Sequence, residues 1–208
     1  ENEGSCIVKW SYKTGKVVDT LLTSNTAFGD PRETFGGYEF SSDERFVVLT
    51  TASEGLYRHS FYANFYVYDF ASSEEARPIT DFSLGKQRLA QLSPAGDKVA
   101  FVRENNIFIS DLATGDEIQV TTDGVTNAII NGATDWVYEE EFGDDQGLFW
   151  NADGSRLAYL KFDESNVREF HMPVYGSLYP DPYTFKYPKA GEDNSDLSVH
   201  IYTLAEDK

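Results

Sequence analysis

A pattern of one tight polar turn followed by β-rich strands occurs three times in this sequence. The turns lie at 41–44, 93–97 and 151–154 and are rich in Ser, Asp and Gly, residues that favour turns through local hydrogen bonds and permitted backbone angles. Each turn follows a short apolar run and precedes a β-rich one, so each predicts a hairpin. The runs after the turns are 45–50, 98–102 and 156–160, and a further β-rich run follows each of them, at 64–69, 106–111 and 197–202.

The spacing of these units predicts a β-propeller. Ser42, Pro94 and Ala152 occupy equivalent turn positions and lie 52 and 58 residues apart. Repeats of roughly 40 to 50 residues with four strands each are typical of propeller blades, and insertions would explain the longer spacing. Short fourth strands are expected at 79–80 and 118–121.

The ends of the sequence fit incomplete units. The runs at 5–10 and 16–20 resemble only the last two strands of a unit, and the third unit stops after Leu204. We therefore expect an all-β fold of antiparallel strands: a partial blade, two complete four-stranded blades and another partial blade. Residues 1–208 would then form part of a single N-terminal propeller domain. An arc of this kind leaves open sheet edges, so we interpret it as a piece of a longer protein.

The charge of the chain limits its partners. Asp and Glu number 35 against 17 Lys and Arg, which gives a formal net charge of -18. Such a protein repels phosphate backbones and anionic lipid headgroups, so we expect neither nucleic acid nor a membrane surface as partner. Hydrophobic residues make up 40% of the chain, enough for a folded core. No apolar run approaches the roughly 20 residues of a membrane span.

The single cysteine, Cys6, excludes an internal disulfide, and a zinc site would need more ligands than the sequence offers. We expect no cofactor and no metal. The chain begins Glu-Asn-Glu instead of with Met, which fits a parent protein that has lost an export or anchor segment. The expected location of that parent is extracytoplasmic, either periplasmic or secreted and membrane-anchored.

Three consecutive glutamates, Glu139 to Glu141, follow Trp136 and Tyr138 and form the most distinctive local feature. Two carboxylates about 4 Å apart repel by about 4 kcal/mol at an effective dielectric constant near 20, so a site that fixes them favours an ammonium group or a metal. The simpler alternative is a solvated helix or turn in an acidic protein. The aromatic neighbours favour anchoring to a core. Thr134 or Asp135 could cap a short helix that carries the run.

Two insertions interrupt the repeat, at 53–63 and at roughly 163–196. Long insertions in a rigid scaffold are frequent binding elements. The first contains Arg58 and His59, whereas the second is rich in Tyr and Pro and carries exposed-type apolar residues on a projecting hairpin. Those residues fit either an interface or the packing of a long loop on itself. They are Phe170, Met172, Val174 and Tyr175.

The run Asp-Trp-Val-Tyr-Glu-Glu-Glu at 135–141, preceded by Asn-Gly-Ala-Thr at 131–134, resembles the propeller of the dipeptidyl peptidase IV family of serine exopeptidases. Tyr-Pro-Lys-Ala-Gly at 187–191 is also similar to that family. The resemblance implies an eight-bladed propeller over an α/β-hydrolase domain, and the release of dipeptides from free amino termini with Pro or Ala in second place. It further implies that Glu140 and Glu141 bind the substrate ammonium, that Arg58 contacts the peptide carbonyl region, and that the 163–196 insertion forms a homodimer arm.

The chemistry of such an enzyme is not expected in this chain. A hydrolase of that fold needs a Gly-x-Ser-x-Gly elbow, and no such pentapeptide occurs. The histidines His59, His171 and His200 are expected to be structural or to lie beside the substrate. The nucleophile, base and oxyanion hole would belong to a C-terminal α/β-hydrolase domain outside this sequence, so the fragment alone should be inactive.

Two other functions fit the same acids. One is a non-catalytic propeller that acts as a protein-interaction module and holds a basic partner with Glu139 to Glu141. The other is a divalent-cation site, although three successive glutamates lack the Asp/Asn and Gly spacing of a calcium loop.

Overall fold

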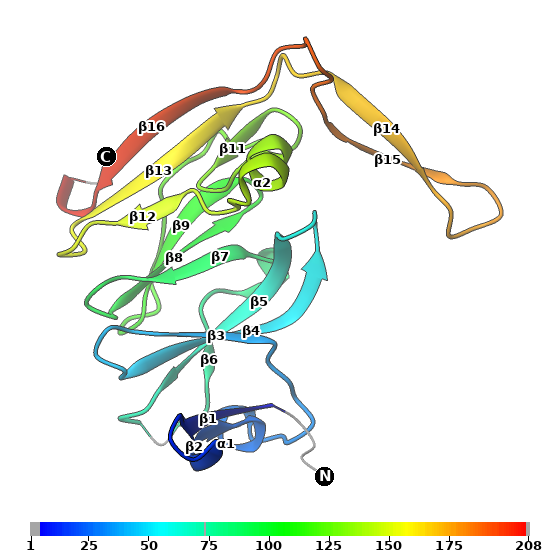
Figure 1. The fold of residues 1–208 in the computed structure, drawn as a ribbon. Coiled ribbons are helices and arrows are strands. Elements are labelled where there is room, and N and C mark those ends of the chain that lie inside the picture. Colours follow the sequence, from blue (N-terminus) through cyan, green and yellow to red (C-terminus); the bar gives the residue numbers. More distant parts are fainter. Residues whose placement is uncertain (1–4, 73, 207–208) are drawn as a thin grey trace.

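The computed structural model describes residues 5–72 and 74–206 and shows an all-β chain of mostly antiparallel strands (Figure 1). The first sheet is a hairpin, and the next two have four strands each, in sequence order from edge to edge. The first sheet contains β1 (Cys6–Ser11) and β2 (Lys16–Thr23), followed by α1 (Ser24–Phe28). The second contains β3 (Gly37–Phe40), β4 (Phe46–Gly55), β5 (Phe61–Asp69) and β6 (Arg77–Pro78). After the short helix η1 (Phe82–Leu84), the third contains β7 (Arg88–Leu92), β8 (Lys98–Arg103), β9 (Asn106–Asp111) and β10 (Glu117–Gln119).

The last large sheet is built around β13 (Arg156–Asp163). One edge of β13 pairs along its whole length with β16 (Asp196–Thr203), which leads into η2 (Leu204–Glu206). The other edge is shared by β12 (Leu148–Trp150) and β11 (Ile129–Asn131), which pair with its two halves. Between β11 and β12 lies α2 (Trp136–Phe142), and between β13 and β16 a separate hairpin, β14 (Glu169–Val174) and β15 (Asp181–Lys186), extends away from the body (Figure 1).

The inner sheets bury both faces, which explains their nearly continuous apolar strands. Successive side chains of a strand point to opposite faces. In β4, Val48 belongs to the core shared with the third sheet, whereas Val47 and Leu49 belong to the core shared with the first. The same alternation in β8 places Phe101 in the core between the second and third sheets, together with Val48, and Ala100 in the core between the third sheet and the β13 sheet. The sheets therefore stack face to face as a curved series, and the described residues form no closed ring (Figure 1).

The predicted equivalence of the turns has a structural counterpart. The hydroxyl of Ser42 donates to the carbonyl oxygen of Pro94 at 2.8 Å. Gly154, in the third turn, lies against Pro94 as well, since a Cβ placed on it would be 3.6 Å from the proline ring. Equivalent turns of adjacent repeats thus contact one another, as expected when similar units stack in register.

Several predicted boundaries differ from the structure because the hydrogen-bonded pairing of neighbouring strands continues past them. The insertion expected at 53–63 is mostly a continuation of the β4–β5 ladder beyond a register shift after Thr51, and only 56–60 form the loop. The strand expected at 79–80 is β6 at 77–78, although the N–H of Ile79 still bonds to the carbonyl of Phe65 at 3.1 Å. The sequence analysis did not predict β11. No helix in the described part of the chain is long and apolar enough to cross a membrane.

Candidate functional site

Helix α2 carries the three glutamates and is fixed at both ends. Its N-cap is Asp135, whose carboxylate accepts from the N–H of Tyr138 at 2.9 Å and from the hydroxyl of Ser195 at 2.6 Å. Gly143 ends the helix in the left-handed conformation, with φ of 68°, which glycine adopts without steric cost. Tyr138 packs edge-on against Phe162 of β13, with ring centroids 4.9 Å apart. Capping and packing together fix the helix on the sheet.

The three glutamates occupy three different environments, because successive helical residues are about 100° apart. Glu139 is completely buried, Glu140 is partly buried, and Glu141 is exposed. The run is therefore not a uniform solvated face. It presents one carboxylate to the interior and two to the side of the helix that solvent reaches.

Glu139 anchors the loop 56–60, which joins β4 to β5. Its Oε1 accepts from the backbone N–H of His59 at 2.6 Å and of Ser60 at 2.9 Å. Charge-assisted bonds of this kind are shorter and stronger than those between neutral groups. A residue about 80 positions away thus holds the two backbone N–H groups that directly follow Arg58. Sequence reasoning missed this role, although Asp135, Tyr138 and Glu139 have the i, i+3, i+4 spacing of one buried helix face.

Arg58 pairs with Glu140 next to that anchor. The Nε of Arg58 lies 2.6 Å from Oε2 of Glu140, and the side chains are 69% and 14% exposed. Exposed pairs of this type contribute little to stability, so the arginine can exchange its partner for a ligand at low cost. The sequence analysis grouped Arg58, Glu140 and Glu141. The structure joins the first two and leaves Glu141 exposed at the next helical position.

A hollow of about 470 Å³ lies beside this pair and is lined by the loop 56–60 and the neighbouring strand ends. Arg58, His59 and Ser60 are among its lining residues. The guanidinium of Arg58 can donate to a carbonyl oxygen, and the carboxylate of Glu140, which pairs with it, can accept from an ammonium group. Among the described residues, no three His, Cys, Asp or Glu side chains are grouped so that they could hold a metal ion.

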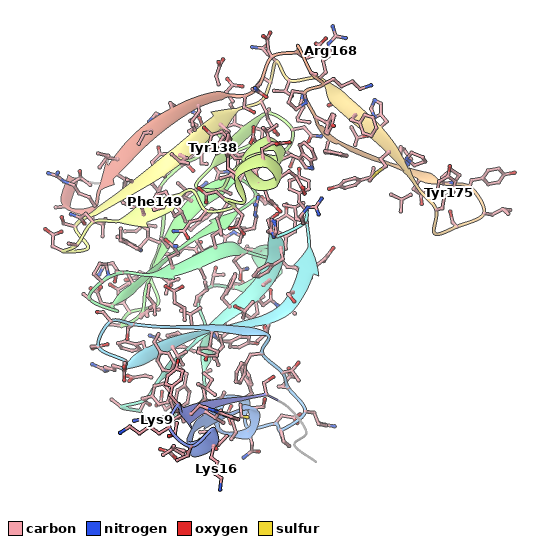
Figure 2. The ribbon with its side chains drawn as sticks, viewed as in Figure 1. Lys9, Lys16, Tyr138, Phe149, Arg168 and Tyr175 are labelled. Atoms are coloured by element: carbon pink, nitrogen blue, oxygen red, sulfur yellow. The ribbon has the colours of Figure 1, made fainter. Side chains whose placement is uncertain are left out.

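The β14–β15 hairpin, here called the arm, divides the residues expected at an interface. Met172, Val174 and Tyr175 are 43%, 48% and 79% exposed, and Figure 2 shows Tyr175 at the far end of the arm from Arg168. Phe170 instead packs on the arm itself, 6.0 Å from Phe185 between ring centroids. Exposed apolar side chains thus lie toward the tip, whereas Phe170 takes part in self-packing.

An aromatic cluster connects the base of the arm to the site. Phe185 is 8% exposed, and its ring lies 6.2 Å from Trp136, the first residue of α2, and 6.2 Å from Tyr57 in the anchored loop. Trp136 also contacts Tyr187 at 4.6 Å. One buried ring from the arm therefore touches both elements that carry the charged residues.

Replacing Phe185 by alanine should lower the free energy of unfolding by about 3 to 5 kcal/mol, because a buried aromatic ring and its contacts are lost. Denaturant unfolding of the intact protein measures this effect. The control is Tyr175→Ala at the exposed tip, which should change stability by no more than about 0.5 kcal/mol. Equal effects of the two changes would contradict the assignment of Phe185 to the core of the arm base.

Glu164 is a second buried acid near the site. It is 6% exposed, and burial raises its pKa to about 7, with the Asp135 carboxylate acting in the same direction and Lys186 in the opposite one. Because this pKa lies above its usual value of 4.5, the folded state holds the proton more tightly than the unfolded state. The stability that this group contributes is complete below about pH 4.5 and is lost as the pH rises to about 7.

We expect the stability of the wild-type protein, relative to Glu164→Gln, to fall as the pH rises from about 4.5 to about 7, since the amide does not titrate. Unfolding free energies of both proteins across this range measure the difference. The exposed Glu169→Gln serves as control and should follow the wild type. Parallel curves for wild type and Glu164→Gln would show that Glu164 does not titrate in this range.

The comparisons with known proteins agree on one family. A family model described as the dipeptidyl peptidase IV N-terminal region matches residues 41–208. A probable dipeptidyl-aminopeptidase B of Podospora anserina is 35% identical over 195 residues, which cover 87% of this chain and 21% of that protein. Dipeptidyl aminopeptidase B of Saccharomyces cerevisiae is 35% identical and covered to 20%, and mouse prolyl endopeptidase FAP is 33% identical and covered to 26%.

A solved structure is similar over the whole chain. The crystal structure of Porphyromonas gingivalis dipeptidyl peptidase 4 matches with a TM-score of 0.90 and 45% identity, over 100% of this chain and 29% of that one. The chain thus spans about a fifth to a quarter of the curated relatives and under a third of the solved protein.

Proposed function

This chain belongs to the family of dipeptidyl peptidase IV N-terminal regions, and from that membership we propose that it is the substrate-recognition part of a serine-type exopeptidase. The parent enzyme would release dipeptides from free amino termini, with Pro or Ala in second place. The observation that carries the proposal is the pair of Arg58 and Glu140, in which Arg58 lines a hollow and directly precedes the loop backbone that Glu139 holds.

In the proposed complex, the α-ammonium of the peptide donates hydrogen bonds to the carboxylates of Glu140 and Glu141. Two carboxylates around one ammonium make strong, charge-assisted bonds and favour the charged form of the amine. Arg58 moves its donors from Glu140 toward the first peptide carbonyl, as a planar and permanently charged group can. Fixing the amino end at a set distance from the reacting bond would make the enzyme cleave only after the second residue of the peptide.

The remaining parts of the proposal concern the parent protein. The two four-stranded sheets and the incomplete sheets beside them would be successive blades of one propeller domain, and the nucleophile and its base would lie on a C-terminal α/β-hydrolase domain. The β16 side chains Leu197, Val199 and Ile201 are 40%, 68% and 61% exposed, which is the pattern of a sheet face that a further blade covers. The exposed tip of the arm would bind a second copy to form a homodimer, and the parent would act outside the cytoplasm.

The test uses the intact parent enzyme and two chromogenic substrates that differ only at the amino end, Ala-Pro-p-nitroanilide and its N-acetyl derivative. We expect the free amine to be cleaved and acetylation to lower kcat/KM by at least about 100-fold, which is the effect of losing about 3 kcal/mol of charge-assisted binding. Equal rates for both substrates would refute an ammonium site. Absence of cleavage in both would favour a non-catalytic binding module.

A further inference from the structure

Arg88, the first residue of β7, is a buried cation for which the described residues provide no ion pair. It is 4% exposed, and its Nε and Nη2 atoms are buried and form no hydrogen bond in the described part of the chain. Burying an unpaired charge costs much more than burying a paired one. A guanidinium held in this way requires an opposite charge nearby, water to solvate it, or both.

Two cavities flank this guanidinium. One, of about 210 Å³, is also lined by Ser60, Glu39 and Asp145, and the other, of about 190 Å³, by Tyr57, Tyr62 and Glu164 among others. Each has charged and polar residues in its lining and is large enough for several waters, since one water occupies about 30 Å³ in the liquid. Arg88 therefore lies between two spaces in which water can complete its hydrogen bonds.

The matching negative group is Glu139. Its Oε1 is occupied by the two backbone bonds to the loop, but its Oε2 is buried and lacks a partner among the described residues, and so does the Oγ of Ser60. Burial lowers the pKa of the Arg88 guanidinium, whereas Tyr62 and Glu139 act in the opposite direction. Ser60 connects the two charges, because it lines the 210 Å³ cavity together with Arg88 and its N–H donates to Glu139.

The surroundings argue against a site for an external anion. Glu39 and Asp145 line one cavity with Arg88, Glu164 lines the other, and Glu139 is close enough to influence the Arg88 charge. Four acids around one guanidinium would repel a further negative group. The buried cation instead compensates acids of the protein itself.

We propose that Arg88 is a positioning residue, whose buried charge acts through cavity water to hold the Glu139 carboxylate against the N–H groups of His59 and Ser60 and thereby to place Arg58 for the substrate. The part of this inference that concerns substrate rests on the proposed function. The part that concerns the loop does not, so the two can fail separately.

A double-mutant cycle tests the pairing. Arg88→Met removes the cation that acts on Glu139, and Glu139→Gln removes one of the acids near Arg88, whereas the double variant removes both charges. Partners that compensate each other give strongly non-additive effects, and independent packing residues give additive ones. Arg103→Met is the matched control, because Arg103 is a 7% exposed arginine of the same sheet that pairs with Glu117 instead.

The first readout is amide hydrogen exchange of the segment 57–61 in the intact parent protein, which requires no activity. We expect exchange about 10-fold faster than wild type in Arg88→Met and in Glu139→Gln, with no further increase in the double variant. Arg88→Lys and Arg103→Met should exchange at a rate near wild type. Unchanged exchange in Arg88→Met, or additive effects in the cycle, would overturn the proposal. If Arg88→Met does not fold, Arg88→Gln replaces it, with restoration by Arg88→Lys as the deciding comparison.

The second readout is the kinetics of a free-amine dipeptide anilide. A misplaced Arg58 weakens binding of the amino end, so Arg88→Met should raise KM about 10-fold with a smaller change in kcat, and Arg88→Lys should restore most of the loss. Faster exchange together with an inactive wild-type parent would leave the positioning of the loop supported and refute only the proposed function. A fall in kcat alone would contradict the role assigned to Arg88.

Discussion

Glu139→Ala is expected to lower the free energy of unfolding by about 3 to 5 kcal/mol, the range observed when one partner of a buried charged network is removed. The carboxylate is fully buried and accepts from two backbone N–H groups at 2.6 and 2.9 Å. Without it, the Ser60 N–H remains buried with no acceptor, which costs about 1 to 3 kcal/mol, and the partly buried N–H of His59 loses its partner as well. The alanine also leaves a cavity and removes one of the acids near Arg88.

The same change should abolish recognition of the amino end, because the backbone that follows Arg58 loses its attachment. Denaturant unfolding measures the stability, and kcat/KM with a free-amine substrate measures recognition. Glu141→Ala is the control for stability, since an exposed glutamate two positions along the same helix should contribute no more than about 0.5 kcal/mol. Similar stability losses in the two variants would contradict the structural role of Glu139.

The second large effect is expected for Glu140→Ala and Glu141→Ala in the intact parent enzyme. Each should lower kcat/KM for free-amine dipeptide substrates by about 2 to 5 kcal/mol, or roughly 30-fold to several thousand-fold, as when one partner of a hydrogen-bonded charge pair is removed. Glu140→Ala also releases Arg58 from its 2.6 Å contact. Because neither carboxylate is fully buried, the fold should stay intact, which separates these variants from Glu139→Ala.

A remote exposed acid provides the control for charge. Asp19→Ala in β2 removes one exposed charge from the first sheet, at the opposite end of the series of sheets from α2 (Figure 1), so it should leave kcat/KM unchanged within about twofold. N-acetylated substrate adds a second check, because the loss on acetylation should shrink in Glu140→Ala. Kinetics equal to wild type in both glutamate variants would remove these residues from the site.

Local patterns predicted most of the strands, because turns and apolar alternation are properties of neighbouring residues. The run 45–50 lies almost wholly within β4, and the run 197–202 within β16. The sequence analysis missed β11 because three residues are too short to show a period, and their pairing partner lies in the distant half of β13. The ladder beyond Thr51 was missed because a bulge interrupts the alternation there.

The candidate site was predicted only in part, because part of its arrangement depends on contacts between segments far apart in the sequence. The family resemblance grouped Arg58 with Glu140 and Glu141, and the structure pairs Arg58 with Glu140 across 82 residues, but the sequence analysis assigned no separate role to Glu139. Only the helix orientation distinguishes the buried Glu139 from its neighbours. Arg88 begins a strand and would normally be interpreted as a polar edge residue, so its burial depends on sheet stacking that no local pattern encodes. The dimer, the compartment and the second-position preference stay predictions.

The most direct measurement of the central claim is a crystal structure of the intact parent protein with an uncleaved peptide that begins with a free Ala-Pro dipeptide. The account predicts the α-ammonium nitrogen at about 3 Å from carboxylate oxygens of both Glu140 and Glu141, with Arg58 turned toward the first carbonyl and Glu139 still bonded to His59 and Ser60. A peptide whose amino end lies elsewhere, with both glutamates in contact only with solvent, would contradict it.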